Sequence, residues 1–326
     1  MDAGVAVGHH GIAISPKESD PLVLLAAAAP LSFVRAIVIG LVQGVTELFP
    51  ISSLGHSVLI PSLLGWQNLV KSQAQKESFY LAFIVGLHVA SALALLLFFW
   101  RDWVRIIKAF FRTLGTRRID SSDERLAWLI IVASIPVGLL GLLFEHQLRT
   151  VFAKPLAAAL FLTLNGMILL AGERARRRSE VRALAVKEGL EPDGNGRRLD
   201  TLDLKEAGII GVAQSAALFA GISRSGVTMV SGLVRGLDHE DAMKFAFLLA
   251  TPIIFAAGIY KIPDLTGHLG NGIRGQILVG SLVAGVASWF SVRFLTRYFR
   301  TRTLTPFGIY CLVAGAFFIV HSLIYA

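Results

Sequence analysis

The stretch QGVTELFPISSLGH, residues 43–56, places a glutamate, a proline and a histidine inside a run of otherwise mostly apolar residues. Glu47 and His56 are ionisable, and a charged side chain is costly to bury in hydrocarbon. Pro50 lacks a backbone N–H and its ring clashes with the preceding turn, so it interrupts a helix. The stretch therefore predicts a helix break with polar groups held beside it.

The chain around this break has the composition of a membrane protein. Of its 326 residues 54% are hydrophobic, and the mean hydropathy is +0.65, well above that of an ordinary soluble domain. A helix needs about 20 apolar residues to cross the hydrocarbon of a bilayer. Nearly uncharged segments of suitable length lie at about residues 79–100, 126–144, 155–172, 245–260, 276–292 and 304–325. We therefore predict an all-α polytopic membrane protein.

The net charge of +9 reflects basic loops rather than a surface for nucleic acid. Arginine-rich connections follow the first and third predicted spans, and a third basic cluster, RFLTRYFRTR at 293–302, separates the last two. The positive-inside rule places these loops in the cytoplasm. The single cysteine, Cys311, excludes a disulfide framework. Residues 1–30 are predicted to be a disordered N-terminal extension.

Two further apolar segments, 31–66 and 206–234, contain polar and helix-breaking residues. With the basic loops in the cytoplasm, the six spans alternate correctly only if each of these segments enters and leaves the bilayer on one side. They are predicted to be re-entrant hairpins, the first from outside and the second from inside. The polar loop 173–205 then separates two membrane repeats, 31–172 and 206–326, each a hairpin followed by three transmembrane helices.

The two hairpins also resemble each other at a constant offset of 171 residues. IGLVQGVTELFPISSLGHS (39–57) aligns without gaps with IGVAQSAALFAGISRSGVT (210–228), including identities at glutamine, serine and glycine. An odd number of crossings in each half makes the two repeats inverted with respect to the membrane. Such an architecture places a site near the bilayer interior, where broken helices from the two halves meet.

The ionisable residues at the two breaks predict the chemistry of that site. GISRSGVT, residues 221–228, is a Gly-bounded loop with three hydroxyls and Arg224, whose planar fork suits phosphate. Glu47 is close enough in sequence to orient His56 or to accept a proton itself. Ser53, His56 or an activated water remain alternative nucleophiles. A simple salt bridge between Glu47 and Arg224 is the structural alternative, and His88 and His321 are predicted to be structural.

These motifs resemble those of the undecaprenyl-diphosphate phosphatases, the bacitracin-resistance proteins. Gln43-x-x-x-Glu47 with PISSLGH at 50–56 is similar to their first signature, GISRSGVT to their second, and KFAFLLATPIIFAAG at 244–258 to a further family segment. The similarity runs from about residue 31 to the C-terminus. Ala220 replaces the proline that usually opens the second motif. Gln43 stands where the family has Glu or Gln, so a second carboxylate for metal binding is absent.

The resemblance implies hydrolysis of undecaprenyl diphosphate to undecaprenyl phosphate and inorganic phosphate. It implies an inner-membrane protein of bacteria whose site faces the periplasm, and it is compatible with a homo-oligomer. Magnesium or calcium is expected from the resemblance alone. The site residues that it implies are Glu47, His56, Arg224 and Ser53 for catalysis, and Gln43, Ser52, Ser223, Ser225, Gly226 and Thr228 for substrate binding.

Two other classes of membrane protein share parts of this pattern. A secondary transporter or lipid flippase also uses inverted repeats and broken helices, but has less use for Glu, His and Ser clustered beside a phosphate clamp. A type-2 phosphatidic-acid phosphatase needs a histidine six residues after the arginine of its second loop, and here position 230 is valine. A phosphatase that acts on a lipid diphosphate fits the residues best.

Overall fold

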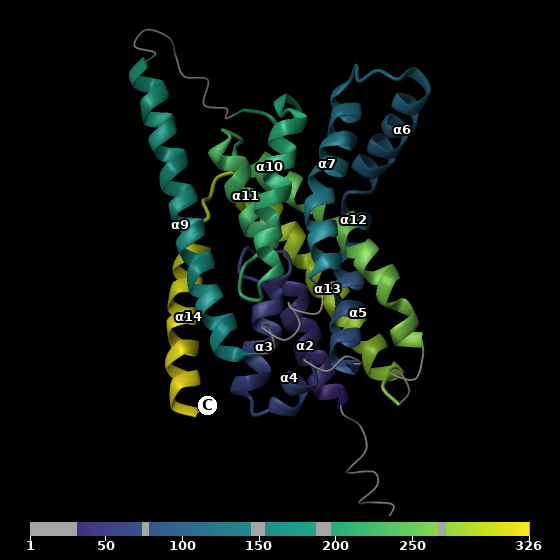
Figure 1. The fold of residues 1–326 in the computed structure, drawn as a ribbon, viewed down its shortest axis with the longest axis vertical. Helices are drawn as coiled ribbons and strands as arrows, with labels where there is room; N and C mark the ends of the chain where they lie inside the picture. Colours follow the sequence, from purple (N-terminus) through teal and green to yellow (C-terminus); the bar gives the residue numbers. More distant parts are fainter. Residues whose placement is uncertain (1–30, 74–77, 145–153, 187–196, 267–271, 326) are drawn as a thin grey trace, which may run out of the picture.

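The computed structural model describes residues 31–73, 78–144, 154–186, 197–266 and 272–325. Within these ranges the secondary structure is helical, with no named strand and one isolated bridge between Arg197 and Leu237. Figure 1 shows a bundle in which the long helices run roughly along the vertical axis. The predicted N-terminal extension, 1–30, lies outside the described residues.

Six helices are long and apolar enough to cross a membrane, which confirms the predicted polytopic all-α class. They are α5 (Phe79–Phe98), α7 (Ser122–Leu143), α9 (Pro155–Val186), α12 (His239–Thr266), α13 (Arg274–Tyr298) and α14 (Thr305–Tyr325). Several helices extend beyond the predicted spans, α9 and α12 the furthest. Helix α9 continues through the arginine-rich 173–186, because Arg, Glu and Ala are good helix formers. Helix α12 begins at His239 because Glu240 and Asp241 favour a helix N-terminus.

Two shorter helix pairs are interrupted at the places where the sequence predicts breaks. The first pair is α2 (Phe33–Thr46) and α3 (Ser53–Leu63). The second is α10 (Leu204–Gln214), continued by the 3₁₀ turn η2 (Ser215–Leu218), and α11 (Arg224–Val234). The helix after each break starts in the same way: Ser52 Oγ accepts a hydrogen bond from the backbone N–H of Gly55, and Ser223 Oγ from that of Gly226, each at 3.2 Å.

The two breaks lie against each other in the interior of the bundle. The N–H of Gly221 donates to Ser52 Oγ at 3.1 Å, and a Cβ on Gly55 would lie 2.9 Å from Gly221 Cα. Asn165 of α9 joins both loops, because its amide donates to the carbonyl of Pro50 at 3.0 Å and accepts from the N–H of Ser223 at 2.9 Å. These contacts bring together segments that are about 170 residues apart in the chain.

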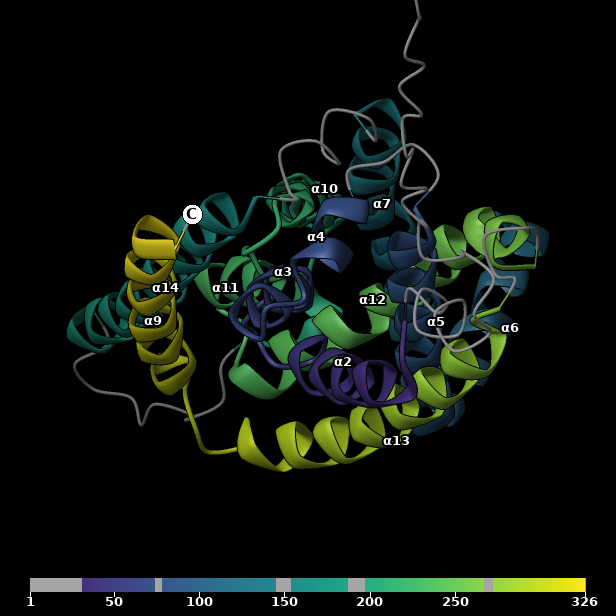
Figure 2. The same ribbon diagram turned by 90° about the horizontal axis from the view of Figure 1, so that it is seen from below.

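The remaining helices complete the bundle around this junction. They are α4 (Gln67–Gln73), α6 (Trp100–Thr116) and the short η1 (Leu199–Thr201). In Figure 2, α3 and α11 lie near the middle of the view, while α9, α14 and α13 lie at its edge. Large apolar side chains are exposed on these outer helices, for example Phe290 of α13 and Leu323 of α14. An apolar outer surface is what the hydrocarbon of a bilayer favours, and the polar groups at the breaks are kept inside the bundle.

Candidate functional site

Glu47 is the centre of a buried polar cluster at the junction of the two breaks. It is the C-cap residue of α2 and is 7% exposed. Its Oε1 accepts from Arg224 Nη2 at 2.5 Å. The contacts of its Oε2 are Gln43 Nε2 at 3.1 Å, Ser53 Oγ at 2.5 Å and His88 Nε2 at 3.1 Å. One carboxylate therefore gathers side chains from four helices.

Arg224 comes from the other helix pair, as the first residue of α11. The salt bridge between Glu47 and Arg224 that the sequence offers as a structural alternative is present. It uses only one of the two terminal nitrogens of the guanidinium. Nη1 of Arg224 is buried and has no hydrogen-bond partner among the described residues. A buried donor without a partner is unfavourable, so Arg224 has a hydrogen-bonding capacity that the salt bridge leaves unused.

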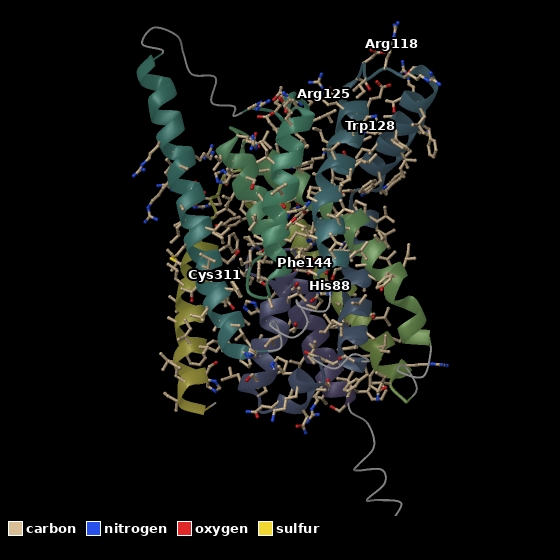
Figure 3. The ribbon with its side chains drawn as sticks, in the orientation of Figure 1. His88, Arg118, Arg125, Trp128, Phe144 and Cys311 are labelled. Atoms are coloured by element: carbon tan, nitrogen blue, oxygen red, sulfur yellow. The ribbon has the colours of Figure 1, made fainter. Side chains whose placement is uncertain are left out.

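His88 belongs to this cluster, which corrects the sequence-based reading of His88 as a structural residue without polar neighbours. It lies on α5, at mid-height of the molecule in Figure 3. Its Nε2 lies 3.1 Å from Glu47 Oε2 and 3.5 Å from Ser53 Oγ, and its Nδ1 lies 2.8 Å from the carbonyl of Ile84. A histidine in the middle of an apolar span was the available signal, but the sequence does not tell which face of α5 meets α2.

His56 lies beside the junction, and its hydrogen-bond partners are Ser52 and Tyr310 instead of the predicted Glu47. Its Nδ1 is 2.7 Å from the carbonyl of Ser52, and its Nε2 is 2.8 Å from the hydroxyl of Tyr310 on α14. The rings of His56 and Tyr310 are stacked at a centroid distance of 5.8 Å. The prediction that Glu47 orients His56 is therefore not realised: Ser52 and Tyr310 orient the imidazole. Tyr310 is a residue that the sequence analysis missed.

The predicted phosphate-binding hydroxyls are buried around the junction. Ser223 Oγ and Ser225 Oγ lie 3.1 Å apart, and Ser225 Oγ is 3.5 Å from the carbonyl of Phe49. Ser52 and Ser223 serve as N-caps, so their oxygens accept from backbone N–H groups. Ser52 also has a hydroxyl proton to donate, whereas the proton of Ser225 is directed at the carbonyl of Phe49. Thr228 is 1% exposed and lies one turn into α11 from Arg224 and close in sequence to Gly226.

Among the described residues, the junction offers one carboxylate, that of Glu47, to a metal ion. No group of three or more His, Cys, Asp or Glu residues that could hold an ion occurs in the part of the chain that the structure describes. Both oxygens of Glu47 already have polar partners. Magnesium is usually bound through one or two carboxylates together with substrate phosphates. The donor set of this site does not fit a preformed magnesium or calcium cage.

The six apolar spans define an integral-membrane protein. Its buried Glu–Arg–His–Ser cluster, at the junction of the two interrupted helix pairs, is an internal site suited to an anion. The comparison with known families is more specific. The pattern of the bacitracin resistance protein BacA matches residues 36–317, and the chain belongs to this family.

Curated relatives cover almost the whole chain. The undecaprenyl-diphosphatase 2 of Frankia alni is 56% identical in an alignment of 331 positions that covers 88% of this chain and 96% of the relative. The undecaprenyl-diphosphatase of Mycolicibacterium paratuberculosis is 58% identical over 297 residues, again with 88% and 96% covered. The undecaprenyl-diphosphatase 2 of Chromobacterium violaceum is 41% identical, with 89% of this chain and 99% of the relative covered.

Proposed function

We propose that the chain hydrolyses undecaprenyl diphosphate to undecaprenyl phosphate and inorganic phosphate, and so recycles the lipid carrier of cell-wall synthesis. The observation that carries the proposal is the free Nη1 of Arg224 beside the short hydrogen bond from Ser53 Oγ to Glu47 Oε2, 2.5 Å. An anion-binding donor thus lies next to a hydroxyl that is already bonded to a base. Family membership and the names of the relatives agree with this chemistry.

The cluster supports a division of roles among its members. Arg224 holds the terminal phosphate through Nη1, because a guanidinium donates strong, charge-assisted hydrogen bonds to phosphate oxygens. Ser53 Oγ attacks the terminal phosphorus while its proton passes to Glu47. The bond from that phosphorus to the bridging oxygen breaks, and undecaprenyl phosphate leaves. Water then releases the phosphate from Ser53.

The other predicted residues bind the diphosphate around this centre. Gln43 donates a hydrogen bond from its amide to Glu47. His56, which contacts the hydroxyl of Tyr310, acts as the general acid that protonates the leaving phosphate. The hydroxyls of Ser52, Ser223, Ser225 and Thr228 donate to phosphate oxygens once the phosphate replaces their present partners, and the first turn of α11, which includes Gly226, favours an anion through its helix N-terminus.

We also propose that the two interrupted pairs are re-entrant hairpins of inverted repeats, with the site open to the periplasm. The matching serine caps of α3 and α11 support the repeat. In Figure 1, α4, which follows the first pair, and the C-terminus lie at the lower end of the molecule. The C-terminal end of α6 and Arg118, which follows it in the chain, lie at the upper end (Figures 1 and 3), and the positive-inside rule assigns this basic loop to the cytoplasm.

Phosphate release from a polyprenyl diphosphate by the purified protein in detergent is the direct test of the activity. We expect release by the wild-type chain and loss of about 100-fold or more for Ser53→Ala, because the group that forms the covalent intermediate is removed. Trapping of radiolabelled phosphate on the wild-type chain, and not on Ser53→Ala, would distinguish attack by serine from attack by water. A lipid flippase without hydrolysis would release no phosphate.

Cysteine labelling in intact cells tests the orientation. The single native cysteine, Cys311, is buried. Leu64 and Arg198 are exposed at positions that the proposal assigns to opposite sides of the membrane. An impermeant thiol reagent should label Leu64→Cys and spare Arg198→Cys. The reverse result would contradict the orientation without affecting the proposed reaction.

A further inference from the structure

We propose that His88 is a positioning residue that holds Glu47 in place while Arg224 engages the phosphate; the inference rests on the proposed function. His88 lies 41 positions along the chain from Glu47 (88 − 47), within an otherwise apolar span of twenty residues. Its imidazole is nevertheless bonded at both nitrogens. Such an arrangement fixes the ring and the atom that it presents to the carboxylate.

The protons of the ring follow from its partners. The carbonyl oxygen of Ile84, 2.8 Å from Nδ1, can only accept, so Nδ1 carries a proton. Nε2 faces Glu47 Oε2 at 3.1 Å, and an ionised carboxylate also can only accept. The geometry is satisfied when Nε2 carries a proton as well and His88 is an imidazolium. The described charged groups that face it are then Glu47 and, across Glu47, Arg224.

A second cation beside Glu47 keeps the buried carboxylate compensated when Arg224 binds a phosphate. At rest, Arg224 compensates the buried carboxylate through Nη2. When the guanidinium also binds a phosphate, less of its positive charge is available to balance the negative charge of Glu47. An uncompensated buried charge is strongly unfavourable. His88 remains bonded to Oε2, the oxygen that also accepts from Ser53. It therefore keeps the carboxylate ionised and correctly placed to take the serine proton.

Two substitutions separate this role from simple packing. In His88→Gln the side-chain amide nitrogen falls near the position of Nε2 and can still donate to Glu47. In His88→Asn the shorter amide reaches only the position of Nδ1, so the hydrogen bond to Ile84 can persist while the contact with Glu47 is lost. His321→Asn, in another membrane span and outside the cluster, is the matched control.

Phosphate release from a polyprenyl diphosphate measures kcat and KM for each variant. We expect His88→Asn to lower kcat by about 10- to 100-fold, because a hydrogen bond to a charged group is lost, with KM changed by less than about twofold. His88→Gln should recover most of kcat, and His321→Asn should match the wild type. Wild-type kcat in His88→Asn, or equal losses in the Gln and Asn variants, would overturn the positioning role.

Infrared spectroscopy provides a second readout that needs no turnover. The carboxylate band of Glu47 can be identified as the band that is missing in Glu47→Gln. We expect His88→Asn to shift this band and His88→Gln to leave it close to its wild-type frequency. An unshifted band in His88→Asn would overturn the inference even if the wild-type chain hydrolyses the lipid. A shifted band in a chain that releases no phosphate would uphold the contact and contradict the proposed function alone.

Discussion

Replacement of Arg224 by lysine separates the two tasks of the guanidinium. In the structure one terminal nitrogen, Nη2, pairs with Glu47 at 2.5 Å, and the other, Nη1, is buried without a partner among the described residues. A lysine can keep the charge pair with Glu47 through its single ammonium. It cannot offer a second donor in the fixed geometry of the planar fork. The variant should therefore fold and still be impaired in catalysis.

The size of the impairment follows from the number of lost contacts. One hydrogen bond involving a charged group is worth about 1.5–3 kcal/mol. Because each 1.36 kcal/mol corresponds to a factor of ten, the loss of the bond from Nη1 to phosphate should lower kcat/KM by about 10- to 150-fold. Arg224→Ala removes both tasks. It leaves the buried Glu47 without one of its cations, which typically costs about 3–5 kcal/mol of stability, and it should also reduce the melting temperature.

The assay is phosphate release at substrate concentrations well below KM, with the melting temperature of each detergent-purified variant measured in parallel. We expect a wild-type melting temperature with a reduced kcat/KM for Arg224→Lys, and reductions in both for Arg224→Ala. Wild-type kcat/KM in the lysine variant would refute the assignment of Nη1 to the phosphate. A melting temperature as low as that of the alanine variant would refute the separation of the two tasks.

Three further predictions concern the surroundings of the cluster. Gly221→Ala should destabilise the protein by about 2–6 kcal/mol, from backbone strain at φ +114° and from a Cβ that would press on the carbonyl of Ala158 in α9. Gly138→Ala, with open space around its Cβ, is the control, and equal melting temperatures would contradict the tight packing of Gly221 against α9. Tyr310→Phe should lower kcat/KM by about 2- to 12-fold through loss of the 2.8 Å bond to His56, and no change would exclude Tyr310 as a partner of the proposed acid. Removal of divalent cations with EDTA should leave the melting temperature unchanged, because no cluster of three or more His, Cys, Asp or Glu residues that could hold an ion occurs among the described residues, whereas a clear decrease would reveal a structural ion.

The sequence predicts the spans and the two breaks well, since both depend on local properties of the chain. Apolar length determines the spans, and Pro50 and the glycines mark the breaks. The pairing of Glu47 with Arg224 could also be foreseen, because two opposite charges in hydrocarbon have few other partners. His88 and Tyr310 could not be assigned, because their roles depend on the rotation of α5 and α14 about their own axes. A nearly uniformly apolar helix has no polar face from which that rotation can be predicted.

The interrupted helices explain how so many polar groups are accommodated inside a membrane protein. A continuous helix satisfies its own backbone and has no free N–H groups to offer in its middle. Each break exposes the first N–H groups of a new helix, and here Ser52 and Ser223 satisfy only part of them. Asn165 satisfies the carbonyl of Pro50 and the N–H of Ser223 at the same time, so the two breaks stabilise each other. The same junction brings Glu47 and Arg224 within 2.5 Å, which means that the contacts that make the breaks tolerable are also those that assemble the site.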